Sequence, residues 1–461
     1  MGKCTSKNFG SEKKGTGIIT SSRVIEVKKA NFRLHYTIEE KIGTDSSSTI
    51  FRVTDKVTGE VRALKSTSLE SSTADSILNE VKILQQIDHP NIIKIIDVYL
   101  ELHCVNIITE LCTGGELFDK ISHHGSFTEA KLCTYAKQMV SGLIYLHNQG
   151  IVHKQLNPEN ILLADKSENS ELKIIDFGRK KKHKQIIYFK APEAFSGDYS
   201  KASDIWSLGV ILYLMASGKP PFEEVENPEQ YYMNIKTNPL QFNGRSWERL
   251  SVEFKELIRS MLNVNPDQRP SAREIYEHEW VVKQSTDVHQ KRLSKRGLAH
   301  LSKYTKKSKF KRALLGFMMN KTVVQDKIKD FQAIFKGIDK NGDGILSIDE
   351  LFDGLRQANF IVDNPLKLIK ALDTDKSGQI SYSEFLTSMV DWEKELSIEK
   401  LSKAFNELDL NKDGFISSEE FMAVLGTDYC QKEFANFMKE ADLNGDGNID
   451  FEEFKAFLRK D

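Results

Sequence analysis

Four twelve-residue segments near the C-terminus carry oxygen-bearing side chains at the spacing that a calcium ion requires. Each begins with aspartate, has glycine at position 6 and ends with glutamate at position 12, and successive copies start 34, 36 and 33 residues apart. Calcium takes about six to eight oxygen ligands from a flexible cage, and the final glutamate supplies two of them. Glycine at position 6 permits the sharp turn that directs the earlier carboxylates inward. The pattern predicts four calcium sites.

Six positions of each loop are expected to supply the ligands, with the backbone carbonyl acting at position 7. In the first two loops they are Asp339, Asn341, Asp343, Ile345, Ser347, Glu350, and Asp373, Asp375, Ser377, Gln379, Ser381, Glu384. In the last two they are Asp409, Asn411, Asp413, Phe415, Ser417, Glu420, and Asp442, Asn444, Asp446, Asn448, Asp450, Glu453. These are EF-hand loops, and the apolar residue at position 8 is expected to pair two loops back to back. By ligand type the fourth loop should bind calcium most tightly, and the second is a candidate weak site.

The region before these loops mixes two periodicities. Tyr36–Gly43, Thr49–Asp55 and Val61–Thr67 are β-rich, and the apolar spacing of Glu129–Asn148 and Ala202–Ser217 predicts helices. A chain of 461 residues is long enough for about three domains. We therefore expect a mixed α and β unit upstream of the calcium loops.

Short motifs of protein kinases occur in order along this unit. They are Ala63-Leu64-Lys65 with Glu80, Glu110-Leu111-Cys112, Gly114-Gly115-Glu116-Leu117-Phe118-Asp119, Asp176-Phe177-Gly178, Ala191-Pro192-Glu193 and Ser203-Asp204-Ile205-Trp206-Ser207-Leu208-Gly209, with Arg269 placed to pair with Glu193. The unit therefore resembles a protein kinase. Together with the calcium loops, nearly the whole chain is similar to the calcium-dependent protein kinases of plants and alveolate protists.

This resemblance implies an α+β bilobal protein kinase fold, with a small β-rich lobe and a large helical lobe, followed by an all-α EF-hand calmodulin-like domain. The implied divisions are an N-terminal segment at 1–33, a kinase-like domain at 34–280, a basic autoinhibitory-type junction at 281–325 and the calmodulin-like domain at 326–461. Five positions would contact ATP: Gly43, Lys65, Glu80, Glu110 and Cys112. Asn160 and Asp176 would hold magnesium.

The catalytic loop departs from the family pattern and reads His153-Lys154-Gln155-Leu156-Asn157-Pro158-Glu159-Asn160. Gln155 stands where the family has the aspartate that accepts the substrate hydroxyl proton, and Asn157 where it has a lysine that steadies the phosphoryl group. A neutral amide cannot take up that proton at pH 7, and general-base catalysis is worth about 10²–10⁴ in rate. The sequence therefore predicts a pseudokinase with a crippled chemical step.

Two further segments weaken the resemblance. The phosphate-cradling loop keeps only Gly43 of its three glycines, and Asp45 places a negative charge near the triphosphate. The segment from Asp176 to Glu193 carries a cationic block, Arg179–Lys184, and Tyr188 is the only hydroxyl between its two flanking motifs. This block is a solvated loop, a docking element for an acidic surface, or a defect of the sequence itself. Binding of magnesium and ATP stays open.

The junction has an uneven charge. Val281–Lys321 contains 12 Lys/Arg and one acid, whereas Thr322–Asp461 contains 17 Lys/Arg and 29 Asp/Glu. Such asymmetry predicts attraction between the two segments, and the apolar run Ala313–Met319 suits a calmodulin-like groove. A solvated face or a nucleic-acid arm is the other interpretation of the basic run; we expect no nucleic-acid partner. In the family this segment occupies the substrate cleft at low calcium and leaves it when the EF-hands fill.

The first six residues fit an N-myristoylation pattern with Gly2 as acceptor, and Cys4 is placed for palmitoylation. One acyl chain gives only marginal membrane binding, so two signals are needed. Five cysteines without a C-x-x-C pair fit a reducing compartment. No apolar run approaches the roughly 18 residues of a membrane span. We expect a cytoplasmic protein held peripherally at a membrane surface.

Three hypotheses follow. The first is a calcium-responsive pseudokinase that exposes or hides docking surfaces for a protein partner. The second is an active Ser/Thr kinase with an atypical catalytic loop that acts on a protein substrate, since phosphoryl transfer depends largely on positioning and electrostatics. The third is a calcium buffer in which the kinase-like unit has no function of its own.

Overall fold

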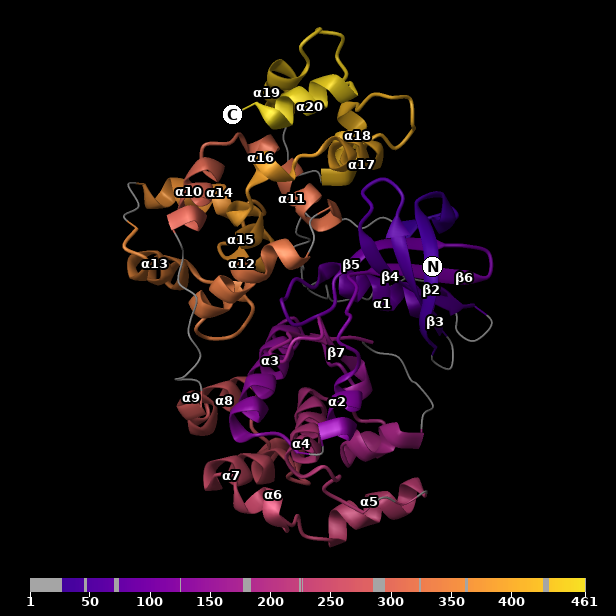
Figure 1. Ribbon diagram of the computed structural model, residues 1–461, viewed down its shortest axis with the longest axis vertical. Helices are drawn as coiled ribbons and strands as arrows, with labels where there is room; N and C mark the ends of the chain where they lie inside the picture. Colours follow the sequence, from indigo (N-terminus) through magenta and orange to yellow (C-terminus); the bar gives the residue numbers. More distant parts are fainter. Residues whose placement is uncertain are drawn as a thin grey trace, which may run out of the picture.

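The EF-hand region lies beside both lobes of a bilobal kinase-like unit (Figure 1). The computed structural model describes residues 27–44, 48–69, 74–124, 126–176, 184–223, 225, 227–284, 295–322, 325–360, 364–425 and 431–460. The proposed acylation positions Gly2 and Cys4, Asp45 of the phosphate-cradling loop and all but the last residue of the cationic block lie outside these ranges. None of the helices in the described ranges has the length and apolar character needed to cross a bilayer.

The small lobe is built on a six-stranded sheet with the order β1-β5-β6-β4-β3-β2. The three predicted strands are present to within one residue at each end, whereas β1, which pairs parallel to β5, was not expected. Val53 and Leu64 are fully buried on the sheet. The elements are β1 Val27–Lys28, β2 Tyr36–Thr44, β3 Ser48–Asp55, β4 Val61–Ser68, α1 Ala74–Gln86, β5 Ile95–Leu100 and β6 Cys104–Thr109.

The large lobe is helical and is centred on α4, Lys201–Ser217. A capping box between Ser200 and Ser203 begins this helix, and Gly218, with φ of 75°, ends it. Nearly all of its residues are buried, as its continuous apolar sequence requires. The other elements are α2 Leu117–His124, α3 Glu129–Asn148, β7 Ile161–Leu163, β8 Leu172–Ile174, α5 Pro228–Thr237, α6 Arg245–Glu248, α7 Val252–Met261, α8 Ala272–Glu277 and α9 Glu279–Gln284, with short 3-10 turns at Pro158–Asn160, Lys184–Phe189, Glu193–Ser196 and Pro266–Gln268.

The C-terminal region contains two pairs of EF-hands preceded by two junction helices. Loops pair through their position 8 residues as predicted, with Leu346 opposite Ile380 and Ile416 opposite Ile449. The elements are α10 Lys295–Tyr304, α11 Lys309–Thr322, α12 Gln325–Ile338, β9 Ile345–Leu346, α13 Ile348–Gln357, α14 Pro365–Leu372, β10 Ile380–Ser381, α15 Tyr382–Met389, α16 Trp392–Glu395, α17 Ile398–Leu408, α18 Ser418–Leu425, α19 Gln431–Ala441 and α20 Phe451–Arg459.

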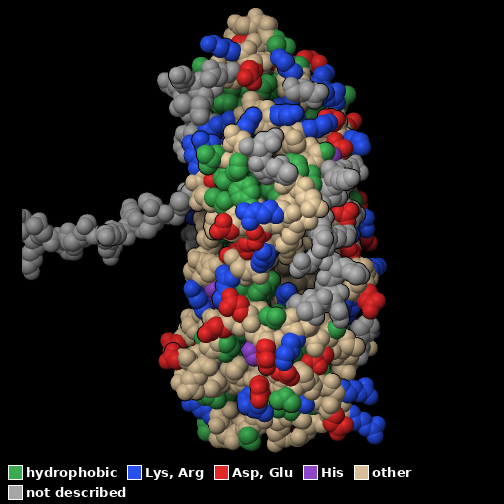
Figure 2. Space-filling view, turned by 90° about the vertical axis from the view of Figure 1, so that its left-hand side faces the viewer, with side chains coloured by type: hydrophobic (Ala, Val, Ile, Leu, Met, Phe, Trp, Pro, Cys, Tyr) green, Lys and Arg blue, Asp and Glu red, His purple; other side chains and the backbone are tan. Residues whose placement is uncertain are grey.

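The junction helix α11 lies inside the EF-hand core. Leu314, Leu315 and Met318 are fully buried there, among the apolar side chains of both EF-hand pairs. Charged contacts add to this packing, since Lys303 pairs with Glu393 at 2.7 Å. The junction therefore contacts the EF-hand region, and α11 does so through apolar side chains; the charge attraction itself stays a prediction. On the face seen in Figure 2, cationic and anionic side chains are interspersed along the length of the molecule.

Candidate functional site

The backbone of the catalytic loop is held by one buried carboxylate. The N–H groups of His153 and Lys154 both donate to Asp204 of α4, each at 2.9 Å. Burial lowers the pKa of His153, and its neutral ring donates from Nε2 to the carbonyl of Ile175 at 3.0 Å. Lys154 and Asp176 take the left-handed φ values of 70° and 61°. The scaffold of a kinase catalytic loop is therefore assembled, strained positions included.

The two substituted positions of this loop are bound into its own turn. The Asn157 amide oxygen accepts the N–H groups of Glu159 and Asn160 at 2.9 and 3.1 Å, which caps the 3-10 turn that follows. Its Nδ2 donates to the carbonyl of Gln155 at 3.1 Å, and Asn157 is only 2% exposed. The Asn157 side chain therefore points inward and caps the turn. The sequence indicates only that a cation is missing at this position.

The residues expected to hold magnesium and phosphate lie beside this loop. The ammonium of Lys65, on β4, forms an ion pair with Asp176. The buried amide of Asn160 donates from Nδ2 to the Gln155 carbonyl at 2.9 Å, so its oxygen is the atom suited to a magnesium ion. Glu80 lies on α1, but its side chain lies outside the described part, so its expected pairing with Lys65 stays a prediction.

The segment that would hold the adenine follows β6. The carboxylate of Glu110 is buried, accepts the N–H of Lys94 at 2.8 Å and pairs with Lys173 at 3.0 Å. Burial, reinforced by Glu110, raises the pKa of the Cys112 thiol to about 12, which keeps that thiol neutral. Gly43 lies on β2 opposite Ile50. A nucleotide pocket of the kinase kind is compatible with these positions.

The end of the activation segment is anchored as predicted. Arg269 makes a two-pronged ion pair with Glu193, with N–O distances of 2.7 and 2.8 Å. Tyr188 packs edge-on against Tyr231 with ring centroids 5.2 Å apart, and its carbonyl accepts the Tyr231 hydroxyl at 3.0 Å. The one hydroxyl side chain of this segment is thus partly packed against the large lobe.

All four calcium loops have the same internal geometry. The N–H of the glycine at position 6 donates to the first aspartate at 2.9 to 3.0 Å in each loop. The glutamate at position 12 accepts the N–H of position 3 at 3.0 to 3.3 Å. The side chain at position 9 caps the following helix in the first, second and fourth loops, and Ser417 makes the same bond in the third. These contacts fix the first aspartate and the last glutamate of each loop against its backbone, and the oxygen donors of the loops fit calcium.

Carboxylates gather most closely in the second loop. Oxygens of Asp373, Asp375 and Glu384 lie within 4.8 Å of one another. Burial, together with Asp375, raises the pKa of Glu384 to about 7. In the first loop, burial together with Asp343 raises the pKa of Asp339 to about 7. Crowded carboxylates that resist ionisation are those that a divalent cation stabilises most.

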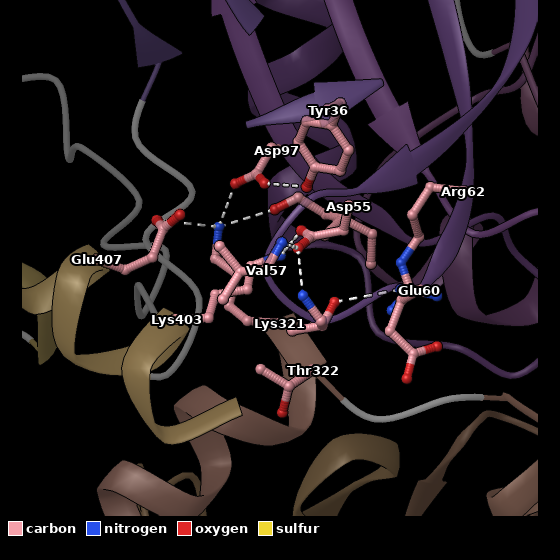
Figure 3. Close-up of polar contacts among 12 residues, drawn as sticks. Tyr36, Asp55, Val57, Glu60, Arg62, Asp97, Lys321, Thr322, Lys403 and Glu407 are labelled. Atoms are coloured by element: carbon pink, nitrogen blue, oxygen red, sulfur yellow. Dashed lines mark hydrogen bonds and ion pairs between the residues drawn. The ribbon is translucent and has the colours of Figure 1, made fainter. Parts of the chain in front are cut away.

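A buried charge cluster links the EF-hand region to the small lobe (Figure 3). Asp97 of β5 is 1% exposed and lies 2.6 Å from the ammonium of Lys321 and 3.2 Å from that of Lys28, and it accepts the Tyr36 hydroxyl at 2.6 Å. From α17, Glu407 pairs with Lys28 at 2.5 Å. The cluster therefore joins the sheet, the end of the junction helix and the third EF-hand.

A second contact of α17 completes this interface. Lys403 pairs with Asp55 at the end of β3. A cavity of about 390 Å³ lies beside the two contacts and reaches Asp409, the first ligand of the third calcium loop. No motif predicted the ion pairs of this interface, because their partners lie between 69 and 379 positions apart in the sequence. The Asn157 cap, in contrast, had a local signal: asparagine followed by proline is typical of a helix start.

Comparisons with known proteins agree with this architecture. The protein kinase domain family matches residues 36–281, and the EF-hand domain pair family matches residues 328–390 and 398–459. The chain is 36% identical over 420 residues to calcium-dependent protein kinase 5 of Plasmodium berghei, covering 87% of this chain and 74% of the relative. It is 30% identical over 421 residues to calcium-dependent protein kinase 9 of Arabidopsis thaliana, covering 88% and 77%.

Proposed function

The chain belongs to the calcium-dependent protein kinase family, and from this premise we propose that it is a calcium-responsive pseudokinase. Its EF-hands bind calcium and act on the rest of the same chain. Its phosphoryl transfer is crippled, and its output is the exposure or concealment of docking surfaces for a protein partner. The observation that carries the proposal is the inward turn of Asn157 beside Gln155.

The two substitutions act on the chemical step. Gln155 cannot accept the substrate proton, and loss of a general base costs about 10²–10⁴ in rate, or roughly 3–5 kcal/mol of barrier. Asn157 provides no cation for the transferring group, and its side chain is bound to the turn Pro158–Asn160. Both losses should depress turnover far more than nucleotide binding.

We also propose that the cleft retains magnesium and ATP. Asn160 and Asp176 would hold the metal, and Lys65 would exchange its ion pair with Asp176 for a phosphate. Glu110 and Cys112 would flank the adenine. When bound, magnesium neutralises phosphate charge. In this chain, bound nucleotide would fix the relation of the two lobes rather than supply a phosphoryl group at an ordinary rate.

The proposed switch is the junction. Calcium opens each helix pair of an EF-hand sensor and changes the groove that the pair presents. The apolar face of α11 fills that groove here, with Leu314 and Met318 fully buried. We propose that calcium changes the grip of the EF-hand region on α11, which alternates between this groove and the kinase-like unit.

We further propose that acylation at Gly2 and Cys4 holds the chain at a membrane surface. The support is the sequence pattern and the need for two signals for stable anchoring. The partner would then meet this protein at the bilayer.

The experiment compares phosphate transfer to a generic basic peptide by wild type, by the Gln155→Asp variant and by the Gln155→Asp, Asn157→Lys double variant, at saturating calcium and MgATP. The proposal expects a wild-type rate at least about 10²-fold below that of the double variant. The intact catalytic-loop scaffold favours the second candidate, an active Ser/Thr kinase with an atypical loop. Wild-type turnover equal to that of the repaired variant would establish that candidate instead.

A further inference from the structure

The first calcium loop lies directly against the large lobe of the kinase-like unit. Its residue at position 4, Gly342, approaches Tyr276 of α8 so closely that a Cβ there would overlap the tyrosine ring. Burial raises the pKa of Tyr276, and the ammonium of Lys137 lies 5.2 Å from the centroid of its ring. The ring is therefore partly buried and packed against the loop, and at position 342 only a residue without a side chain fits against it.

The other three loops do not need glycine at position 4 for this reason. In the second and third loops the position is Lys376 and Lys412, with φ of 60° in both, so a side chain is compatible with the loop turn itself. In the fourth loop it is Gly445, with φ of 77°, and nothing lies within 4 Å of the place of its Cβ. The contact with the kinase-like unit therefore requires glycine at position 342, whereas the geometry of a calcium loop does not.

The glycine at position 6 of the first loop has a similar neighbour. A Cβ at Gly344 would overlap the ring of His89, whereas the corresponding glycines of the other loops have nothing within 4 Å. The ring of His89 is fixed: Nδ1 accepts the N–H of Asn91 at 3.0 Å, so Nε2 carries the proton and donates to Ser141 at 3.0 Å. The loop thus meets a rigid aromatic surface on the kinase-like unit.

Polar contacts join the same two surfaces. Arg273 of α8 donates from Nη1 to the carbonyl of Asn341 at 2.8 Å, and its Nη2 lies 3.6 Å from Oδ2 of Asp343. Asp343 is the position 5 ligand of the loop. A guanidinium beside it opposes the approach of a second cation to the same carboxylate.

The helix that enters the loop adds two more ion pairs. On α12, Lys329 pairs with Asp165 at 2.9 Å and Lys336 pairs with Glu171, both acids lying in the connection between β7 and β8. Since calcium reorients the entering helix of an EF-hand relative to the exiting helix, ion binding in this loop must act on all of these contacts.

We propose that the first calcium loop is the docking surface for the large lobe, with Gly342 allowing the approach to Tyr276, and that Arg273 and calcium compete for Asp343. Docking then lowers the calcium affinity of this loop, and by thermodynamic reciprocity calcium in this loop weakens docking. The proposal rests on the calcium response proposed above, and it assigns the coupling between calcium binding and docking to the first loop.

A matched pair of variants of the full chain tests the docking surface. Gly342→Lys and Gly445→Lys place the same side chain at position 4 of loops 1 and 4, and Lys376 and Lys412 show that the loop turn accepts it. Amide hydrogen exchange over α8 and residues 339–346 is the readout, without calcium. The proposal expects faster exchange in both segments for Gly342→Lys and wild-type exchange for Gly445→Lys. Equal behaviour of the two variants would overturn it.

Calcium titration calorimetry of the full chain tests the competition. Arg273→Gln should raise the affinity of one site by about two- to fivefold, because the ion pair is partly exposed. The gain should vanish in the Glu350→Gln background, where the first loop lacks its last ligand. If calcium binds but Arg273→Gln leaves its affinity unchanged, only this inference is wrong. If the full chain does not bind calcium, both the inference and the proposed function are wrong.

Discussion

The ammonium of Lys321, at the end of the junction helix, lies 2.6 Å from the carboxylate of Asp97 in the small-lobe sheet. Lys321 also donates to the carbonyl of Ile96 at 2.8 Å, and both charged side chains are almost fully buried. The helix α11, which packs inside the EF-hand region, therefore contacts the kinase-like unit at its C-terminal end. We expect that a change in the position of α11 would act on β5 through this contact.

Removal of Lys321 should destabilise the protein. Loss of one partner of a buried ion pair leaves the other charge uncompensated, which typically costs about 3–5 kcal/mol, and Lys28 would offset part of this. We expect Lys321→Met to lower the free energy of unfolding by about 2–4 kcal/mol in urea titration. Lys303→Met is the control, because Lys303 and Glu393 are both exposed; its change should stay within about 1 kcal/mol. Equal effects of the two variants would contradict the account of this cluster.

The same cluster should make the protein sensitive to acid. Burial alone would raise the pKa of Asp97, but Lys321 and then Lys28 hold it well below its usual value. A carboxylate with a depressed native pKa stabilises the fold above its unfolded pKa of about 4, and this contribution is lost as pH falls below that value. We expect Asp97→Asn to flatten the acid limb of stability measured between pH 5 and pH 2. An unchanged acid limb would show that Asp97 does not carry this dependence.

Calcium affinity should fall as the pH falls through 7. Burial raises the pKa of Asp339 and of Glu384 to about 7, and calcium needs both carboxylates ionised. From pH 8 to pH 6 the affinities of the first two loops should fall by roughly tenfold. Calorimetry in two buffers of different ionisation enthalpy should detect proton release at pH 7.

Two comparisons control this prediction. In the third loop, burial is outweighed by the N–H groups of Ser417 and Asn411, which lower the pKa of Glu420, so that loop should lose little affinity over the same range. In the calcium-free protein, Asp339 and Glu384 bind protons more tightly when folded than when unfolded. These two groups should therefore contribute a decrease in the free energy of unfolding as pH rises from about 4 to 7, measured as the difference between wild type and the Asp339→Asn, Glu384→Gln variant. A difference that does not change over that interval would contradict the raised pKa values.

The cap at Asn157 should contribute measurably to stability. Loss of a capping side chain costs about 0.5–2 kcal/mol, so Asn157→Ala should lower the free energy of unfolding by about 1 kcal/mol. Asn157→Ser keeps a capping acceptor without burying a charge beside the Gln155 carbonyl, so it should lose less stability than Asn157→Ala. If Ala and Ser behave alike in thermal unfolding, the side chain does not act as a cap.

Much of this architecture follows from local patterns. The calcium loops, the pairing of Leu346 with Ile380 and the helix Glu129–Asn148 all depend on residues close in sequence, and each was predicted. The Glu193–Arg269 pair was predicted from the resemblance. The cluster around Asp97 was not, because the partners Lys28, Lys321 and Glu407 come from three separate elements and have no local periodicity. The close approach of Gly342 to Tyr276 escaped prediction because glycine in a calcium loop has a sufficient local explanation.

Calcium should change how the EF-hand region holds α11. Amide hydrogen exchange of residues 309–322 in the full chain, with and without calcium, tests it most directly. We predict that calcium changes the exchange of this helix, and that a chain with Glu350, Glu384, Glu420 and Glu453 all changed to glutamine shows no such change. Identical exchange of wild-type α11 in the two conditions, with calcium binding verified in the same sample, would contradict the account.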